Sequence, residues 1–541
     1  MKEKSKKSLG VMIDLSRNGV MSLSSLERFL KIIKRMSYNT VFLYMEDTYQ
    51  VENEAYFGYM RARYSIEEMK KIDDLCFKLG IEAIPCIQTL AHLKTYMKWG
   101  QADVDCNDIL LVDSPRSYEL IGNMLKTLSS CFRSRKIHIG MDEAHMLGRG
   151  RYFTENGYKP SYEIIKTHLE KICEIANPYN YQILLWSDMF FRFWNNGEYY
   201  FNDIVNVPNE AKKALPNSVL PVYWDYYSDT EQKYDTMIKM HKQLSKDTWF
   251  AGGAWCWTGF APLNGLSVRL MKEAMIACRK NRVKNVFITM WGDDGMECSH
   301  FSQLPALLAI SEYYKGNFDE TKIKSRFKKI VGIDYDDFMK TDLPNHLGKE
   351  PSYAESPSKY MLYSDPFLGF LDYTVTRGAS EIYKSHKKEL LAVAKKTRKY
   401  AYVFKTLASL CAVLEIKHEL GVRTREAYKS GNYDELKLLI KDYEKTQKRV
   451  KVFHGLLKEQ WNKDNKPCGF EVQDARLGGL IMRLETCKCS IQDYLKGKID
   501  KIDELEYVIL PLPFSNTPKG EAIDYGAYGR IATANVLTQS M

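Results

Sequence analysis

The sequence predicts an α/β protein in which a (β/α)8 TIM barrel is followed by an α-helical C-terminal domain. Two observations predict this fold. Eight short apolar segments alternate with segments of helical periodicity over residues 1–320, and residues 321–541 are lysine-rich and helical by pattern. Uninterrupted apolar runs are typical of parallel strands that are buried on both faces. Eight such runs in one domain fit a closed barrel better than an open sheet.

The expected strands are short and end in polar or aromatic residues. The third of them, residues 81–87, begins directly after Gly80, which suits a helix end. In chain order, the strands are expected at residues 9–15, 40–45, 81–87, 137–141, 182–188, 219–225, 248–255 and 286–291.

The intervening helices carry recognisable start signals. Ser24 is expected to cap a helix that runs through Arg35, and Ser65 with Glu68 three residues later forms a capping-box pattern. Further helices are expected around residues 118–132, 162–176 and 267–281.

The second domain is expected to consist of long amphipathic helices. A helix from Glu389 to about Leu420 is expected to stop at Gly421, and further helices are expected at residues 433–454 and 474–495. The tail after Leu512 is expected to be loop-like. This domain either completes a cleft of the barrel or forms a homodimer contact, and the sequence does not decide between the two roles.

Composition disfavours several classes of protein. A net charge of +10 from 78 basic and 68 acidic residues is mild for 541 residues, so the lysines are interpreted as solvated surface and no nucleic-acid partner is expected. No apolar run reaches the length of a membrane span, and no signal core follows the basic N-terminus, so a cytoplasmic protein is expected. The twelve cysteines are expected to be reduced, and Cys487 and Cys489 have no zinc-type partners near them. No metal, and no nucleotide held in a glycine-rich loop, is expected.

Two adjacent carboxylates, Asp142 and Glu143, follow the fourth expected strand. Buried charges need partners, and close packing of like charges raises one pKa, so one of the pair could remain protonated and act as an acid. The alternative interpretation is a helix N-terminus, where acidic residues interact favourably with the helix dipole.

Polar and aromatic residues gather at the carboxyl ends of the expected strands, which in a barrel form the active-site face. Aromatic walls with directed carboxylate acceptors suit the faces and hydroxyls of sugar rings, so a carbohydrate pocket is expected. The residues at these ends are Arg17, Glu46, His92, Asp142, Glu143, Trp186, Asp188, Trp224, Asp225, Trp255, Trp257, Trp291 and Asp293.

The segment His138-Ile139-Gly140-Met141-Asp142-Glu143-Ala144 resembles the catalytic segment of family-20 glycoside hydrolases, the β-N-acetylhexosaminidases. Weaker similarities follow the family order. They lie at Gly10 to Arg17, at Gln88 to His92, at Leu185 to Asp188 and at Trp291 to Asp293. The match covers about residues 8–320, lacks the accessory domain that often precedes the barrel, and looks like the compact intracellular-type or bacterial C-type branch.

The resemblance implies an exo-acting enzyme that uses the substrate's own 2-acetamido group as the nucleophile and needs no cofactor. Glu143 would be the acid and base, and Asp142 would orient the acetamido group, with His92 tuning the pair. The other implied contacts to the sugar come from Arg17, Glu46, Trp186, Trp224, Tyr227 (with Tyr223 as the next choice), Trp255, Trp291 and Asp293, and Asp225 is a further candidate hydroxyl acceptor.

Two alternatives from other classes remain at this point. One is a barrel glycosidase with an ordinary carboxylate nucleophile such as Asp225 or Asp293, and the other is a non-catalytic sugar-binding protein. The sequence does not determine the preference between N-acetylglucosamine and N-acetylgalactosamine, the natural linkage or the aglycone of the oligosaccharide or glycoconjugate substrate.

Overall fold

A computed structural model describes residues 7–537, apart from residues 349–350, 352–353, 514, 516, 518 and 524–525. The chain forms two compact units that interleave along the sequence. The first unit comprises Met1–Ala254, Ser267–Trp291 and Ala306–Ile323, and the second comprises Trp255–Leu266, Gly292–Pro305 and Lys324–Met541.

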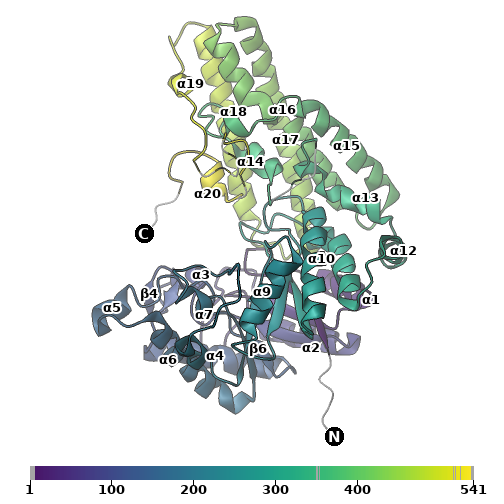
Figure 1. Cartoon of the computed structure of the whole chain (residues 1–541). Coiled ribbons are helices and arrows are strands. Elements are labelled where there is room, and N and C mark those ends of the chain that lie inside the picture. Colours follow the sequence, from purple (N-terminus) through teal and green to yellow (C-terminus); the bar gives the residue numbers. More distant parts are fainter. Residues whose placement is uncertain are drawn as a thin grey trace. The chain divides into compact units, whose positions relative to one another are not determined.

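The first unit is a closed barrel of eight parallel strands, so the predicted fold is confirmed (Figure 1). The strands neighbour one another in the order β1-β10-β9-β8-β7-β6-β3-β2, and β1 closes the barrel by pairing with β10. Their bounds are β1 Ser8–Asp14, β2 Thr40–Tyr44, β3 Glu82–Cys86, β6 Lys136–His138, β7 Gln182–Trp186, β8 Val219–Trp224, β9 Trp249–Gly253 and β10 Asn285–Met290.

Helices connect successive strands of the barrel, as Figure 1 shows. The main connecting helices are α1 Leu23–Arg35, α2 Ile66–Leu79, α4 Pro115–Cys131, α6 Ser161–Ala176, α8 Asn209–Ala214, α9 Glu231–His241 and α10 Asn264–Lys280, and α11 Leu304–Lys315 follows the last strand. The sequence patterns did not predict α8, α9 or α11. They also missed a small hairpin and further short helices, namely β4 Val104–Cys106 with β5 Ile109–Leu110, α3 Lys94–Met97, α5 Arg151–Asn156 and α7 Met189–Arg192.

Helix caps explain where two of these helices begin. Ser65 and Glu68 form the predicted capping box at the start of α2, and Gly80 ends that helix with a left-handed φ of 63°. The predicted cap of α1 is wrong by two residues: Ser22 accepts the hydrogen bond from Ser25 N, and Ser24 lies inside the first turn. Both serines satisfy the composition of a cap, and only the extended backbone at Ser22 makes it the residue that caps.

Aromatic side chains fill the barrel. The rings of Phe42 and Phe287 stack with centroids 4.2 Å apart, and Trp249 meets Phe42 edge-on at 5.9 Å. His138 and Trp186 lie together with their ring centroids 4.3 Å apart, and both are buried. Burial of each large ring stabilises the fold by roughly 1.5–3 kcal/mol relative to exposure. The interior is therefore a packed core that holds the strand ends in place.

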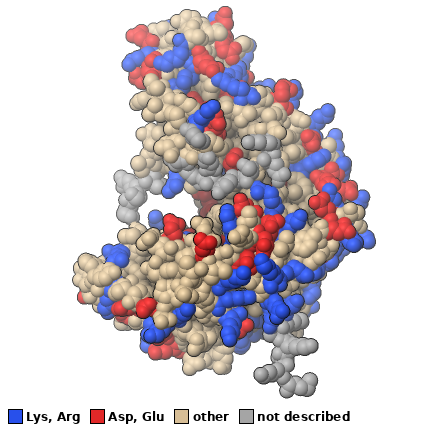
Figure 2. Space-filling view, in the orientation of Figure 1, with Lys and Arg blue, Asp and Glu red and all other residues tan. Residues whose placement is uncertain are grey.

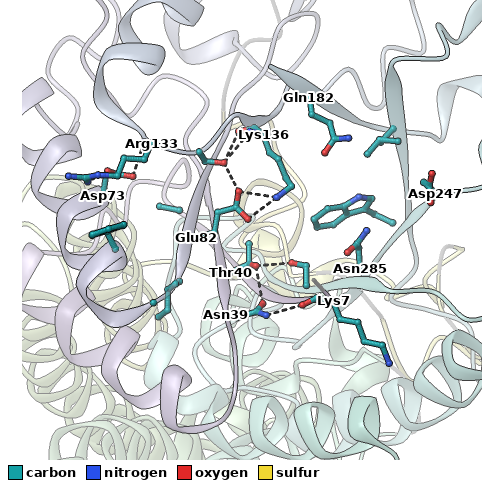
Figure 3. A pocket seen from close by; sticks show the side chains of 18 residues that line it. Lys7, Asn39, Thr40, Asp73, Glu82, Arg133, Lys136, Gln182, Asp247 and Asn285 are labelled. Carbon is teal, nitrogen blue, oxygen red and sulfur yellow. Dashed lines mark hydrogen bonds and ion pairs between the residues drawn. The ribbon is translucent and has the colours of Figure 1, made fainter. Parts of the chain in front are cut away.

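The amino-terminal ends of the strands surround a cavity of about 700 Å³ (Figure 3). Its charged walls pair with each other: Lys136 Nζ lies 2.8 Å from Glu82 Oε2, and Arg133 pairs with Asp73. Thr40 and Ser8 hydroxyls share a 2.7 Å hydrogen bond in the same wall. This end of a barrel ordinarily serves stability, and its internally paired side chains agree with that role.

The second unit contains the long helices of the C-terminal half. The bounds are α12 Glu320–Val331, which begins at the end of the first unit, α13 Tyr335–Met339, α14 Pro357–Tyr363, α15 Ala379–Lys396, α16 Ala401–Lys429, α17 Tyr433–Asp464, α18 Glu471–Leu495, α19 Asp503–Glu506 and α20 Tyr528–Ile531. α15 to α18 pack in chain order, each against the next (Figure 1). Apart from α20, the described residues after Leu512 have no regular secondary structure.

One predicted helix in this region is wrong in two respects. The expected helix over residues 389–420 is two helices, α15 and α16, separated at residues 397–400, and Gly421 lies inside α16. A Cβ on Gly421 would lie 2.9 Å from the backbone oxygen of Pro366. The glycine therefore serves close packing of a neighbouring chain segment and does not end the helix.

Buried charges fix a loop of the second unit. The side chain of Lys359 on α14 is 1% exposed, and its Nζ lies 2.9 Å from Asp294 Oδ2 and 2.7 Å from Glu297 Oε2. Arg476 on α18 pairs with the same two carboxylates at 2.9 and 3.0 Å. The segment Gly292–Pro305, which continues from β10, is thus held by side chains of α14 and α18.

The surface carries charges of both signs. Basic and acidic side chains are interspersed over the face shown in Figure 2. Several pairs lie one turn apart on the same helix, such as Lys463 with Glu459 at 2.6 Å and Lys437 with Asp434 at 2.9 Å on α17. Within the described part of the chain, none of the helices has the length and apolar character required to span a bilayer.

Candidate active site

Asp142 and Glu143 lie in a strained turn at the carboxyl end of β6. Gly140, Met141 and Glu143 have left-handed φ values of 74°, 73° and 52°. A non-glycine residue in this region costs roughly 1–3 kcal/mol, which the surrounding structure must supply. No helix begins at the pair, because residues 139–150 are described as turns and irregular chain and α5 starts at Arg151. The alternative of a helix N-terminus is therefore excluded.

The turn brings both carboxylates to one histidine. His92 Nε2 lies 3.4 Å from Asp142 Oδ2 and 3.8 Å from Glu143 Oε2. Successive side chains of an extended strand point to opposite faces, so neighbours reach a common partner only if the strand ends in such a turn. His92 itself has a left-handed φ of 60°, and its backbone N–H donates to Asp108 Oδ2 at 3.1 Å.

The charges of this cluster are set by one another. Burial by itself would lower the pKa of His92, but the carboxylate of Asp142 raises it to about 10. Burial alone would raise the pKa of Asp142, but His92 and the amide of Gln88 hold it below its usual range. At neutral pH the imidazole is therefore protonated and Asp142 is ionised.

Gln88, two residues after β3, anchors Asp142, and sequence reasoning did not single it out. Its Nε2 donates to Asp142 Oδ1 at 2.8 Å, and its Oε1 accepts from Met141 N at 3.1 Å. The same Nε2 reaches Tyr44 Oη at 2.9 Å, and that hydroxyl donates to Glu46 Oε1 at 3.0 Å. The available signal was an amide side chain two residues past the end of a buried strand.

Arg17 and Glu46 continue this network around the barrel. Arg17 Nη2 lies 3.2 Å from Glu46 Oε1, and its Nε lies 3.9 Å from Asp14 Oδ2. Burial raises the pKa of Glu46, against the lowering effect of Arg17. Polar residues that follow β1, β2, β3 and β6 thus form one connected set at the carboxyl ends of these strands.

Asp188 stabilises the turn that carries Asp142 and Glu143. It is fully buried, and its Oδ2 accepts from Glu143 N at 3.2 Å and from Arg192 Nε at 3.1 Å. Burial, together with the charge of Asp142, raises the pKa of Asp188 to about 7. The pKa of Asp188 therefore moves towards neutrality, whereas the pKa of Asp142 is lowered.

Aromatic rings line the same end of the first unit. The Trp186 and Trp291 ring centroids are 6.1 Å apart, and Trp291 meets Tyr44 edge-on at 4.6 Å. Trp224 stacks on Tyr226 at 5.5 Å, and the Tyr226 hydroxyl hydrogen-bonds with Trp291. These contacts join the rings that follow β7, β8 and β10 into one wall.

The structure distinguishes the two candidate tyrosines, Tyr227 and Tyr223, and adds a third, Tyr226, which sequence reasoning did not name. Tyr227 is 51% exposed, and Tyr223 donates its hydroxyl to Asp225 Oδ2 at 2.6 Å. Tyr226 is buried, and burial together with the nearby charge of Asp142 raises the pKa of its hydroxyl. Asp225 also accepts from Tyr227 N at 2.9 Å and Ser228 N at 3.0 Å, so its oxygens shape the turn after β8.

Two of the predicted residues, Trp255 and Asp293, belong to the second compact unit. Trp255 follows Ala254 directly and stacks on Trp257 with centroids 4.2 Å apart. Asp293 precedes Asp294, the carboxylate that pairs with Lys359 and Arg476.

Comparison with known proteins shows similarity to one family. Residues 335–523 match the model of the Glycoside Hydrolase 20C C-terminal domain. Hexosaminidase D from Homo sapiens is 22% identical over 343 residues, which are 58% of this chain and 66% of that protein. These matches make the chain similar to glycoside hydrolase family 20, with the family model covering residues 335–523. Hexosaminidase D from Bos taurus is 20% identical over 343 residues, covering 57% of this chain and 92% of that protein. The match to the human protein thus spans slightly less than two thirds of its length.

Solved structures give weaker likenesses. The GH20 exo-β-N-acetylglucosaminidase from Vibrio harveyi has 14% identity and a TM-score of 0.47, covering 62% of this chain and 59% of that chain. The β-N-acetylhexosaminidase from Bacteroides fragilis has 16% identity and a TM-score of 0.45, covering 61% and 70%.

No group of three histidine, cysteine, aspartate or glutamate side chains with metal-binding geometry occurs among the described residues.

A substitution tests the turn at the end of β6. Gly140→Ala is expected to destabilise the protein by about 2–4 kcal/mol, because the new Cβ would enter a left-handed backbone 2.8 Å from the Ile87 carbonyl oxygen and would collide with Gln88. Urea denaturation measures the change. Gly122→Ala on α4 is the control: its Cβ would meet only Ile175 at 3.7 Å, so equal or greater stability is expected. Equal stabilities of the two variants would contradict the role of Gly140.

The ion pair of His92 predicts a pH dependence of stability. Its folded pKa of about 10 exceeds its ordinary value of 6.5, so its contribution is complete below pH 6.5 and is lost as the pH rises towards 10. The difference in unfolding free energy between the wild type and His92→Asn is therefore expected to be largest near pH 6 and to shrink by pH 10. Urea denaturation at several pH values measures it, and a pH-independent difference would contradict the pairing.

Proposed function

We propose that the chain is an exo-acting β-N-acetylhexosaminidase that releases terminal β-linked N-acetylglucosamine, N-acetylgalactosamine or both from an oligosaccharide or glycoconjugate. The observation that carries the proposal is the consecutive pair Asp142 and Glu143, joined through His92 at one strand end. A carboxylate nucleophile that works with a separate acid lies across the sugar from it. Two consecutive residues of one turn suit a reaction in which the nucleophile belongs to the substrate.

In this reaction the 2-acetamido oxygen attacks the anomeric carbon as the bond to the leaving oxygen breaks. Glu143, whose side chain is 44% exposed, gives its proton to the leaving oxygen. The oxazoline that forms is opened by water, which loses a proton to Glu143 as it attacks the same carbon. The anomeric configuration is retained, and Glu143 regains its proton for the next cycle.

Asp142 is suited to guide the acetamido group. Because His92 and Gln88 keep it ionised, it accepts the acetamido N–H and stabilises the positive charge that grows on that group. The Nε2 atom of His92 also lies 3.8 Å from Glu143 Oε2.

The barrel residues around the pair support a pocket for the sugar. Trp186, Trp224 and Trp291 supply aromatic walls, and Arg17 with Glu46 supplies polar groups for outer hydroxyls. For the hydrogen bond to the acetamido oxygen, burial and proximity to Asp142 favour Tyr226 over Tyr227. The sugar-binding roles of Trp255 and Asp293 stay predictions from the sequence.

One assay tests the proposal as a whole. Hydrolysis of an aryl N-acetyl-β-glucosaminide is compared with that of its galacto epimer and of the plain β-glucoside. Turnover of at least one N-acetylated substrate and negligible turnover of the plain glucoside are expected, since the glucoside lacks the nucleophile. Equal turnover of the plain glucoside, or a trapped ester between an enzyme side chain and the anomeric carbon, would instead indicate a carboxylate nucleophile.

The acid role of Glu143 predicts a dependence on the leaving group. Glu143→Gln is expected to lose on the order of a hundredfold or more in kcat/KM with oligosaccharides and clearly less with good aryl leaving groups. Glu155→Gln on α5, an exposed acid outside the site, is the control. Equal and small losses on both substrate types would remove Glu143 from this role.

Participation of the acetamido group predicts an inhibitor. Asp142→Asn is expected to lose on the order of a hundredfold or more in kcat, and a thiazoline analogue of the oxazoline is expected to inhibit the wild type. The analogue should bind the Asp142→Asn variant more weakly, as inhibition constants will measure. Absence of inhibition of an active wild-type enzyme would argue against the substrate nucleophile.

A further inference from the structure

Three aromatic rings gather at the surface of the loops that follow β2 and β3. The Tyr56 and Tyr59 ring centroids are 5.6 Å apart, and the Trp99 ring lies 5.9 Å from Tyr56 and 5.2 Å from Tyr59. Tyr56 and Tyr59 are 43% and 40% exposed, and Met60 beside them is 71% exposed. We call Tyr56, Tyr59 and Trp99 the loop aromatic cluster. Grouped exposed apolar surface of this kind is typical of a binding site.

A polar cavity of about 330 Å³ adjoins the cluster, within the usual range of small-ligand sites. Its floor is rigid, because Glu54 accepts from Arg116 Nη1 at 2.8 Å, from Asn123 Nδ2 at 3.0 Å and from Tyr96 Oη at 3.1 Å. The lining residues are Asn53, Glu54, Ala55, Tyr56, Gln101, Arg116 and Glu119.

The lining selects the class of ligand. The lining contains two carboxylates, two side-chain amides and one arginine that is already paired. These groups disfavour the binding of phosphate and are suited to hydrogen bonds with uncharged hydroxyls. Tyr56 belongs to both the cavity and the aromatic cluster, so a ligand there meets a flat ring and directed polar groups together. That combination suits a sugar ring, which has an apolar face and a polar edge.

The cluster is tied to the candidate active site by the loops that carry it. The loop after β3 holds both Trp99 and His92, and His92 Nε2 lies 3.8 Å from Glu143 Oε2. The loop after β2 begins at Met45, next to Glu46. Its Arg61 donates to the backbone oxygen of Ser16, the neighbour of Arg17, and lies 3.5 Å from Asp47. Because His92 lies close to the proposed proton donor Glu143, the loop that it shares with Trp99 begins beside the position proposed for the leaving group.

We propose that the loop aromatic cluster and its polar cavity bind the sugar rings on the reducing-end side of the scissile bond. The substrate is then a β-linked oligosaccharide whose inner sugars stack on these rings. This inference rests on the proposed function and extends it from the cleaved sugar to the remainder of the chain.

Binding to a catalytically impaired protein tests the site. The full-length Glu143→Gln variant is titrated calorimetrically with N-acetylglucosamine and with its β-1,4-linked tetramer, and the ratio of the two affinities is compared among further variants in that background. Trp99→Ala and Tyr56→Leu are each expected to lower the tetramer-to-monomer ratio about 3- to 10-fold, as expected for the loss of one stacked ring. Trp99→Phe, which keeps a flat ring, is expected to retain most of the ratio.

Phe77→Ala is the matched control. Phe77 is 68% exposed and has Arg133 over its ring, as Trp99 has Lys98 over its own, but it lines the cavity at the opposite end of the barrel. The ratio is expected to be unchanged in this variant. An unchanged ratio in Trp99→Ala and Tyr56→Leu, or an equal fall in Phe77→Ala, would overturn the site alone. Failure of the Glu143→Gln parent to bind either sugar would overturn the proposed function as well.

Discussion

The imidazolium of His92 lies within 4 Å of two carboxylates that are neighbours in the sequence, and the carboxyl end of the barrel is arranged around that contact. Consecutive residues reach a single partner only because the chain turns through left-handed conformations at Met141 and Glu143. The closed barrel maintains this strained turn. Gln88 on one side and Asp188 on the other bond to its backbone, and each is held by further buried groups.

The same contacts determine the protonation states of Asp142 and Asp188. In a medium of low polarity, an ionised aspartate persists only beside a compensating cation and hydrogen-bond donors. His92 and Gln88 provide these for Asp142, whereas Asp188 has one arginine and lies near two other acids. One carboxyl group is therefore kept ionised, and a neighbouring one is brought towards neutrality, by the positions of a few side chains from different strands.

The second unit contains more of the chain than its long helices. It contains the two segments that directly follow β9 and β10, so the helical half folds together with parts of the sequence that belong to the barrel's connections. Lys359 and Arg476 illustrate the dependence, because they pair with Asp294 and Glu297 in a largely buried cluster. Removing either partner of such a pair leaves a buried charge unpaired, typically at a cost of about 3–5 kcal/mol.

The sequence by itself determined the barrel and the class of site residues. Eight apolar runs of strand length, alternating with helical patterns, favour strands that are buried on both faces, and the polar residues after them then lie at the carboxyl ends of the strands. Local signals also sufficed to predict the capping box at Ser65. At Ser24 and Gly421, however, the residue type fits more than one local structure. Only the tertiary structure shows that Ser22 is the cap, because of its extended backbone, and that Gly421 lies inside a helix, where Pro366 approaches it closely. It also decided which side chains meet: the anchoring by Gln88 and Asp188, and the burial of Tyr226 beside an exposed Tyr227, depend on turns that redirect side chains away from the alternation of a strand. Such turns are stabilised by contacts between distant segments, and the sequence pattern of either segment does not contain that information.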